Sequence, residues 1–166
     1  MRKLFILAIV LVFSLTAQAQ AQSPQGRDFG FGITLGDPTG ITGKFWTGGV
    51  NAFAISVGSS YYGNIRLTGD YLWHFNAFNS KVVNLYAGPG LVLGFGHGNE
   101  WFYKRDDDKF WDRDDDIGVA GRAIFGINVV PRRTPLEFFL EVGVLVGVIP
   151  GFGTHGEAAL GVRFYP

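Results

Sequence analysis

Serine, histidine and carboxylate side chains could together form a hydrolytic site in this chain of 166 residues. Such chemistry needs a nucleophile within hydrogen-bond reach of a base that a third group orients. The topology expected below would gather the candidates near one rim; they are Ser59, Ser60, His97, Glu100, His155 and Glu157. None stands in a motif whose spacing fixes a serine beside its base, so the sequence predicts no catalytic residues. His74, at the opposite end, is expected to be an interfacial polar residue.

A run of aspartates offers a second candidate chemistry, calcium binding. Asp112, Asp114 and Asp116 alternate as the first three ligands of a calcium loop do. That loop also needs a glycine at the next position and a glutamate at its twelfth, where the chain has Ile117 and Ala123. We therefore expect a solvated surface loop here, with no metal site and no cofactor.

The N-terminus has the layout of a secretory signal peptide. Arg2 and Lys3 precede an apolar run at residues 4–15, and small residues then offer Ala-x-Ala ending at Ala19 and again at Ala21. Twelve apolar residues rise only about 18 Å as a helix, which is short of a hydrocarbon core of about 30 Å. We expect a signal peptide over residues 1–21, cleaved after residue 19 or 21, and a short periplasmic lead over residues 22–27.

The composition of the remainder is typical of strands and turns. There are 25 glycines and no cysteine, and the aromatic residues comprise 16 Phe, 6 Tyr and 4 Trp. An exported domain without disulfides must be stabilised by its sheet and its solvent. Removing Arg2 and Lys3 from the 14 basic residues leaves 12 against 14 acidic ones. This balance argues against a nucleic-acid partner.

Side chains alternate in polarity along three segments. In each segment one set of alternate positions is mostly apolar and bulky, while the other set mixes charges with glycine and alanine. The apolar set comprises the odd positions of residues 64–75 and the even positions of residues 136–148 and 157–165. A soluble sandwich or barrel would bury the bulky face and expose an ordinary polar face to water. Here no such polar face remains. The small and charged residues suit the tight interior of a small barrel, and the bulky ones suit lipid.

Eight segments have about the length of a tilted transmembrane strand, and turn residues separate them. They are Asp28–Gly36, Ile41–Gly48, Asn51–Tyr61, Asn64–Phe75, Val82–Gly96, Ile117–Val130, Leu136–Ile149 and Glu157–Tyr165. The sequence thus predicts an all-β fold, a closed antiparallel eight-stranded transmembrane β-barrel over residues 28–166. With periplasmic termini, the long charged connection at residues 98–116 is an outer loop. Pro89, inside the fifth segment, predicts a bulge or kink.

Aromatic residues of the apolar parity mark the two rims. Near the termini they are Phe29, Phe45, Trp73, Phe75, Phe138 and Phe164, and near the opposite rim they are Tyr61, Tyr62 and Phe95. This arrangement is typical of an interfacial girdle.

Charged residues of the inner parity predict a cluster inside the barrel. They are Lys44, Arg66, Asp70, Arg122, Glu137, Glu141 and Arg163, with Glu157 as a fourth anion. Counting back from the turns brings Arg122 level with Gly143, near Arg163, and places Glu141 diagonal to both. Buried charges must be paired, and eight strands leave room for side chains rather than for a channel. A self-neutralised plug is favoured over a narrow porin-like pore.

Four motifs carry a resemblance to a known class. They are residues 36–46 (GDPTGITGKFW), 70–74 (DYLWH), 135–141 (PLEFFLE) and 161–165 (GVRFY). The chain resembles a family of small eight-stranded outer-membrane β-barrels, similar in plan to OmpA and OmpX. The resemblance covers nearly all of the mature chain and implies fold and location, with no catalytic residues to carry over. Such barrels usually end in an aromatic residue, whereas Pro166 ends this chain and Phe164 lies two residues earlier. Some eight-stranded barrels modify lipid A, which makes a rim-sited hydrolase or acyltransferase the alternative function.

The expected function is that of a structural or surface-interaction protein of the bacterial outer membrane. Its partners are outer-membrane lipid and lipopolysaccharide, the barrel-insertion machinery, and an extracellular ligand bound through the outer loop. That loop combines aromatic side chains with both signs of charge, as binding hot spots do. Its candidate binding residues are Trp101, Phe102, Tyr103, Lys104, Arg105, Asp106, Asp107, Asp108, Phe110 and Trp111.

Overall fold

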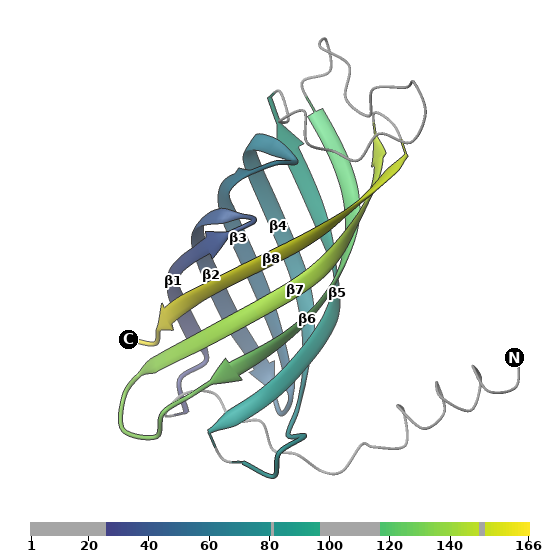
Figure 1. Cartoon of the computed structure of the whole chain (residues 1–166). Coiled ribbons are helices and arrows are strands. Elements are labelled where there is room, and N and C mark those ends of the chain that lie inside the picture. Colours follow the sequence, from purple (N-terminus) through teal and green to yellow (C-terminus); the bar gives the residue numbers. More distant parts are fainter. Residues whose placement is uncertain (1–25, 81, 97–116, 150–151) are drawn as a thin grey trace, which may run out of the picture.

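The structure, a computed structural model, describes residues 26–80, 82–96, 117–149 and 152–166. Within them eight antiparallel strands close into one barrel, each paired with the next and β8 paired with β1 (Figure 1). The strands are β1 Phe29–Gly36, β2 Thr39–Gly48, β3 Asn51–Ser60, β4 Gly63–Phe75, β5 Val83–Phe95, β6 Ile117–Val129, β7 Leu136–Ile149 and β8 Gly153–Phe164. The predicted closed eight-stranded antiparallel barrel is confirmed. No helix in these ranges is long and apolar enough to cross a membrane.

The two ends of the barrel differ in outline. The terminal end, where β1 begins and β8 ends, also holds the turns that follow β2, β4 and β6. The far end holds the turns after β1 and β3 and the connections after β5 and β7. Strands β1 to β3 have 8 to 10 residues and β4 to β8 have 12 to 14. The rim of the far end is therefore low over β1 to β3 and rises along β4 to β8 (Figure 1).

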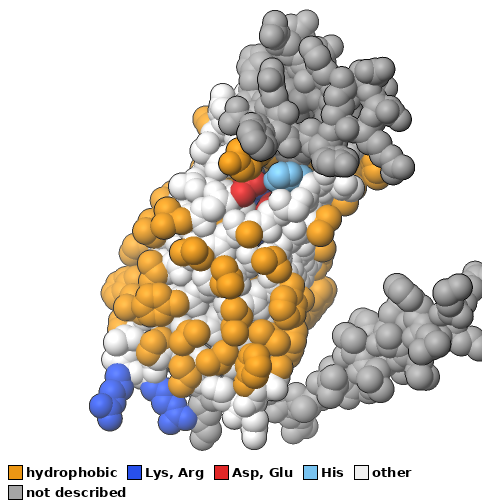
Figure 2. All heavy atoms as spheres, in the orientation of Figure 1, with side chains coloured by type: hydrophobic (Ala, Val, Ile, Leu, Met, Phe, Trp, Pro, Cys, Tyr) orange, Lys and Arg blue, Asp and Glu red, His pale blue; other side chains and the backbone are white. Residues whose placement is uncertain are grey.

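The polarity of the barrel is inverted relative to a soluble protein. In β4 the side chains of Arg66, Thr68 and Asp70 are buried, while the neighbouring Ile65 and Leu67 are exposed. Strand β7 repeats the pattern, and hydrophobic side chains cover the outer wall in Figure 2. The predicted facing of both parities is confirmed. Strand pleating alone produces this alternation, because successive side chains point to opposite faces of the wall.

Glycines on the inner face make room for aromatic rings from the neighbouring strand. Tyr86 pairs with Gly126 across β5 and β6, and Phe139 pairs with Gly161 across β7 and β8. A Cβ atom at either glycine would overlap the ring opposite. Tyr165 covers Gly30 in the same way. The glycines of the inner face thus leave the space into which aromatic rings pack. A narrow barrel interior has no other room for such rings.

Two strand boundaries differ from the prediction by more than one residue. β2 begins at Thr39 and β8 at Gly153, two and four residues earlier than the segments at Ile41 and Glu157. Residues 153–156 have the composition of a turn, yet they pair with residues 144–147 of β7. A long neighbouring strand offers backbone hydrogen-bond partners, so residues of turn composition beside it can adopt the extended conformation and join the sheet. The girdle prediction is also wrong at Tyr62, which is buried.

Of the bulge or kink predicted at Pro89, the bulge is absent. The β4–β5 register passes from Asp70 opposite Gly90 to Trp73 opposite Ala87, with no residue gained or lost. The pairs between them are missing from the ladder, whereas on its other side Pro89 pairs with Ala123 of β6. A gap in the ladder, rather than a shift of register, absorbs the missing proline donor.

Candidate functional site

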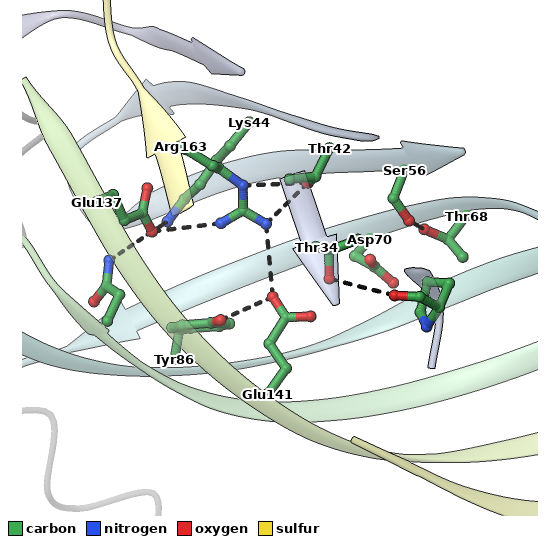
Figure 3. Close-up of polar contacts among 12 residues, drawn as sticks. Thr34, Thr42, Lys44, Ser56, Thr68, Asp70, Tyr86, Glu137, Glu141 and Arg163 are labelled. Carbon is green, nitrogen blue, oxygen red and sulfur yellow. Dashed lines mark hydrogen bonds and ion pairs between the residues drawn. The ribbon is translucent and has the colours of Figure 1, made fainter. Parts of the chain in front are cut away.

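A continuous network of charged side chains occupies the barrel interior. All seven residues of the predicted interior cluster are buried, as are Glu157 and Asp37. They come from β2, β4, β6, β7 and β8 and from the turn after β1. Opposite charges alternate along the barrel axis, so that most side chains contact partners on two sides. Figure 3 shows the part of this network around Arg163.

Glu137 is the centre of the network at the terminal end. Its Oε1 accepts from Lys44 Nζ at 2.7 Å and from Asn128 Nδ2 at 2.9 Å, and Arg163 Nη1 lies 3.5 Å away. Its Oε2 accepts from the hydroxyl of Tyr165. Burial raises the pKa of Tyr165, so this hydroxyl keeps the proton that it donates. A fully buried carboxylate is tolerated here because four donors surround it.

Lys44 lies inside an aromatic enclosure. Its Nζ is 4.4 Å from the centre of the Trp46 ring and 5.3 Å from that of Tyr86. It also lies 2.8 Å from His74 Nε2. An ammonium can only donate, so Nε2 accepts and the Nδ1–H of His74 donates to the carbonyl of Val50 at 3.0 Å. His74 is therefore an interior residue, and the prediction of an interfacial one was wrong: its even position in β4 turns it inward with Asp70.

Glu141 bridges two guanidinium groups halfway along the barrel. Its Oε2 lies 3.6 Å from Arg122 Nη2, and its Oε1 lies 3.7 Å from Arg163 Nη2. Tyr86 donates its hydroxyl to Oε1 at 2.8 Å. The structure thus brings the three predicted residues together, although the predicted pairing was wrong. Arg122 pairs with Leu145 instead of Gly143, a shift of two residues along β7. Arg163 pairs with Glu137, which is six residues from Gly143 along the same strand.

Arg122 also contacts two further carboxylates. Its Nε lies 3.3 Å from Asp70 Oδ1 and 3.0 Å from Glu157 Oε1. None of these three atoms has a hydrogen bond with acceptable geometry within the described residues. Next to them, Asp70 and Arg122 line an interior cavity of about 10 Å³ together with Thr34, Thr42, Ser56, Glu141 and Arg163. That volume is about the room one water molecule needs.

Arg66 organises the network at the far end. Its Nη2 lies 2.6 Å from Glu157 Oε2, and its Nη1 lies 3.4 Å from Asp37 Oδ1 and 3.0 Å from Ser60 Oγ. Asp37 accepts from the hydroxyl of Ser60 and lies 3.2 Å from His155 Nε2. Sequence reasoning placed Asp37 only in a turn. The available signal was that this turn shares the far end with Ser60 and with Arg66.

Ser60, Asp37 and His155 are the three residue types of a hydrolytic site, but their order differs from the one that catalysis requires. A nucleophilic serine needs the histidine beside it and the carboxylate behind the histidine. Here the carboxylate of Asp37 lies between the other two side chains. Ser60 Oγ also accepts from the backbone N–H of Tyr62 at 3.1 Å. Burial raises the pKa of Tyr62 itself to about 12, so its protonated hydroxyl donates to the carbonyl of Ile149 at 3.3 Å.

Several predicted residues lie outside the described part of the chain. These are the signal peptide at residues 1–21, the rim candidates His97 and Glu100, the aspartate pattern at residues 112–116, and the binding residues Trp101, Phe102, Tyr103, Lys104, Arg105, Asp106, Asp107, Asp108, Phe110 and Trp111. Ser59 is described and is exposed on the outer parity, away from Asp37. Within the described ranges, no three His, Cys, Asp or Glu side chains form a metal-binding group.

No protein-family model, curated protein or solved structure matches this chain. The fold and the interior network define a closed eight-stranded β-barrel with an apolar outer wall and a charged interior.

Proposed function

We propose that this chain is a bacterial outer-membrane β-barrel with a plugged interior. It acts as a structural or surface-interaction protein through its outer loops. The observation that carries the proposal is the inverted polarity: exposed hydrophobic side chains such as Leu91, 68% exposed, cover the wall, and no charged residue of the described strands faces outward. In water so much exposed apolar surface would drive aggregation, whereas in lipid it is the required surface.

The height of the wall is consistent with a membrane. Ten paired residues rise about 33 Å along a strand, and a tilt of about 40° reduces this to about 25 Å. β3 has 10 residues and β4 has 13, so every part of the wall beyond the short β1 reaches the apolar thickness of such barrels.

The interior favours a plug over a narrow pore. The charged side chains reach across the barrel from several strands and contact one another from Lys44 at the terminal end to His155 at the far end. The cavity of about 10 Å³ beside Arg122 is too small for a hydrated ion.

In the proposed orientation, with the termini in the periplasm, the connection at residues 98–116 lies on the outer side of the membrane. It joins β5 to β6 at the far end, opposite the termini. If the termini are periplasmic, this connection meets lipopolysaccharide and extracellular ligands, while the insertion machinery meets the barrel from the periplasm. Protease added to intact cells is then expected to cut at Lys104, Arg105, Lys109 or Arg113 and to leave the barrel whole. Protection of these sites would reverse the orientation.

Two tryptophans allow the membrane location to be tested directly. Trp73 is 48% exposed on the outer wall, whereas Trp46 is 2% exposed inside, and both lie toward the terminal end. We would fold two variants into phosphatidylcholine vesicles, one keeping only Trp73 and one keeping only Trp46, with the remaining tryptophans changed to Phe. Lipids brominated in their acyl chains quench tryptophan fluorescence on contact.

Strong quenching of Trp73 and weak quenching of Trp46 is the expected result. A gel on which the unboiled protein migrates differently from the boiled protein shows that each variant has closed its barrel. Equal quenching of the two residues, or no quenching of Trp73 in a closed barrel, would contradict the membrane location.

A further inference from the structure

The exposed charges of the described residues all lie at one end of the barrel. Arg27, Arg132 and Arg133 are exposed, and Asp28 is the exposed acidic side chain, whereas every other described Lys, Arg, Asp and Glu side chain is buried inside. On the face shown in Figure 2 the blue side chains are found only at the terminal end. This end therefore carries a positive surface, and the wall above it carries none.

The turn between β6 and β7 holds two of these arginines outward. Arg132 and Arg133 lie between Pro131 and Pro135, and Thr134 N–H donates to the Pro131 carbonyl at 3.4 Å. The flanks of the turn are tied to neighbouring chain segments: Val130 N–H donates to Val82 O at 2.7 Å, and Tyr165 N–H donates to Pro135 O at 2.8 Å. The rigid proline-flanked turn keeps both guanidinium groups away from the barrel.

Neither Arg132 nor Arg133 has an ion-pair or hydrogen-bond partner among the described residues. Arg27 is different, because its Nη1 donates to the carbonyl of Tyr165 at 2.6 Å. Two adjacent guanidinium groups without a carboxylate are suited to phosphate oxygens, which they bind in a bidentate manner. The ligand cannot enter the barrel, since Trp46, Tyr165 and Glu137 fill the interior at this level.

The arginines stand just beyond the edge of the apolar wall. Phe138 and Phe164 point outward at the terminal end of β7 and β8, with 47% and 40% of their surfaces exposed. Leu136, the first residue of β7 after the turn, pairs with Phe164. A partner that contacts both groups must present an apolar phase directly beside a layer of phosphate. A lipid leaflet has this structure, and a soluble protein or a free anion does not.

We propose that Arg132 and Arg133 bind the headgroup phosphates of anionic phospholipids in the leaflet that faces the chain termini. The proposal rests on the proposed function, since it requires a barrel inserted in a bilayer. The two guanidinium groups select anionic over zwitterionic headgroups and fix the depth of the terminal end at the headgroup layer.

The test compares the full mature chain with R132Q/R133Q and with the charge-retaining control R132K/R133K. Each protein is folded into vesicles of phosphatidylcholine with a minority of phosphatidylglycerol, and the ratio of the two lipids bound to the extracted protein is measured by native mass spectrometry. Each arginine near an anionic surface is expected to change the preference about fivefold, so R132Q/R133Q should lose the phosphatidylglycerol enrichment by roughly 25-fold. R132K/R133K should keep most of it.

Equal enrichment in the native protein and in R132Q/R133Q would overturn the proposal, and so would the absence of enrichment in the native protein. An excess of inorganic phosphate is added in a parallel arm. If it removes the bound phosphatidylglycerol, the site takes free phosphate and the lipid proposal fails. Folding into vesicles of pure phosphatidylcholine distinguishes failure of this inference from failure of the proposed function. A chain that does not insert into them refutes the membrane barrel itself. A chain that inserts into them but shows no headgroup preference in the mixed vesicles refutes only this inference.

Discussion

Arg163 pairs with Glu137 across β7 and β8, yet its guanidinium also contacts Glu141, which lies four residues further along the same inner face of β7. Arg163 thereby joins the network around Glu137 to the one around Arg122. Its Nε and Nη2 further donate to Thr42 Oγ1 at 3.2 and 3.1 Å, and its guanidinium carbon lies 3.8 Å above the ring of Phe139. With these contacts, one side chain from the last strand connects β2 and β7 inside the barrel.

Removing the carboxylate that Arg163 shares with Arg122 should destabilise the barrel strongly. In Glu141→Ala the two guanidinium groups stay buried without the anion between them, and the hydroxyl of Tyr86 loses its acceptor. Breaking a buried ion pair from one side costs about 3–5 kcal/mol. The barrel is folded into vesicles and unfolded with urea, and tryptophan fluorescence reports the fraction unfolded at each urea concentration.

Val142→Ala is the matched control, since Val142 follows Glu141 in β7 and is exposed on the outer wall. Glu141→Gln should fall between the two variants, because it keeps an acceptor for Tyr86 and removes only the charge. If Glu141→Ala unfolds at the same urea concentration as Val142→Ala, the ion pairs in the interior do not stabilise the barrel.

The identity of the interior residues could be read from the sequence because the side chains of a strand alternate with a period of two. Arg66 and Asp70 had to share a face, and a charge that cannot lie in lipid had to point inward. The position of each interior residue along the barrel axis was harder to predict from the sequence. Turn geometry shifted the pairing of Arg122 by two residues, from Gly143 to Leu145, and no residue pattern encodes that shift.

Asp37 shows a second limit of sequence reasoning. It lies in a segment with turn composition, outside any alternating pattern, and only the closed barrel brings it to Arg66 and His155. Contacts between residues distant in sequence depend on the curvature and stagger of the barrel as a whole. Gly161 is a related case, because parity places it inside but does not reveal that Phe139 already occupies the space beside it.

A charge on the outer wall should be costly in a bilayer. Val144 is 53% exposed in the middle of β7. We expect Val144→Arg to lower the free energy of unfolding in vesicles by about 2–4 kcal/mol, as charges near the membrane midplane do. Val144→Leu, which keeps the surface apolar, should change it little. Equal unfolding midpoints for the two variants would mean that this surface does not face hydrocarbon.

The packing of rings onto glycines can be tested on one strand. In Gly126→Ala the new methyl group would overlap the ring of Tyr86, whereas in Gly121→Ala it meets no atom within 4 Å. Both glycines belong to β6, so their backbone setting is comparable. Overpacking costs about 1–3 kcal/mol, and we expect that loss for Gly126→Ala and a change near zero for Gly121→Ala. Thermal unfolding in detergent micelles is sufficient, and a larger loss for Gly121→Ala would contradict the inward facing of Tyr86.

The far-end contacts of Asp37 predict that Ser60 and His155 have a structural role. Ser60→Ala and His155→Ala each remove one group bound to this carboxylate, and Asp37→Asn weakens its ion pair with Arg66. Since Asp37 lies between the serine and the histidine, His155 is not placed to act as a base on Ser60 in this arrangement. Lipid A extracted from cells that express the native protein should have the same mass spectrum as lipid A from cells that express any of the three variants.

Asp37→Asn should nevertheless lower the unfolding temperature, because Arg66 is then left with Glu157 as its charged partner. A change in lipid A mass that requires both Ser60 and His155 would restore the lipid-modifying alternative and would mean that these side chains rearrange when substrate binds.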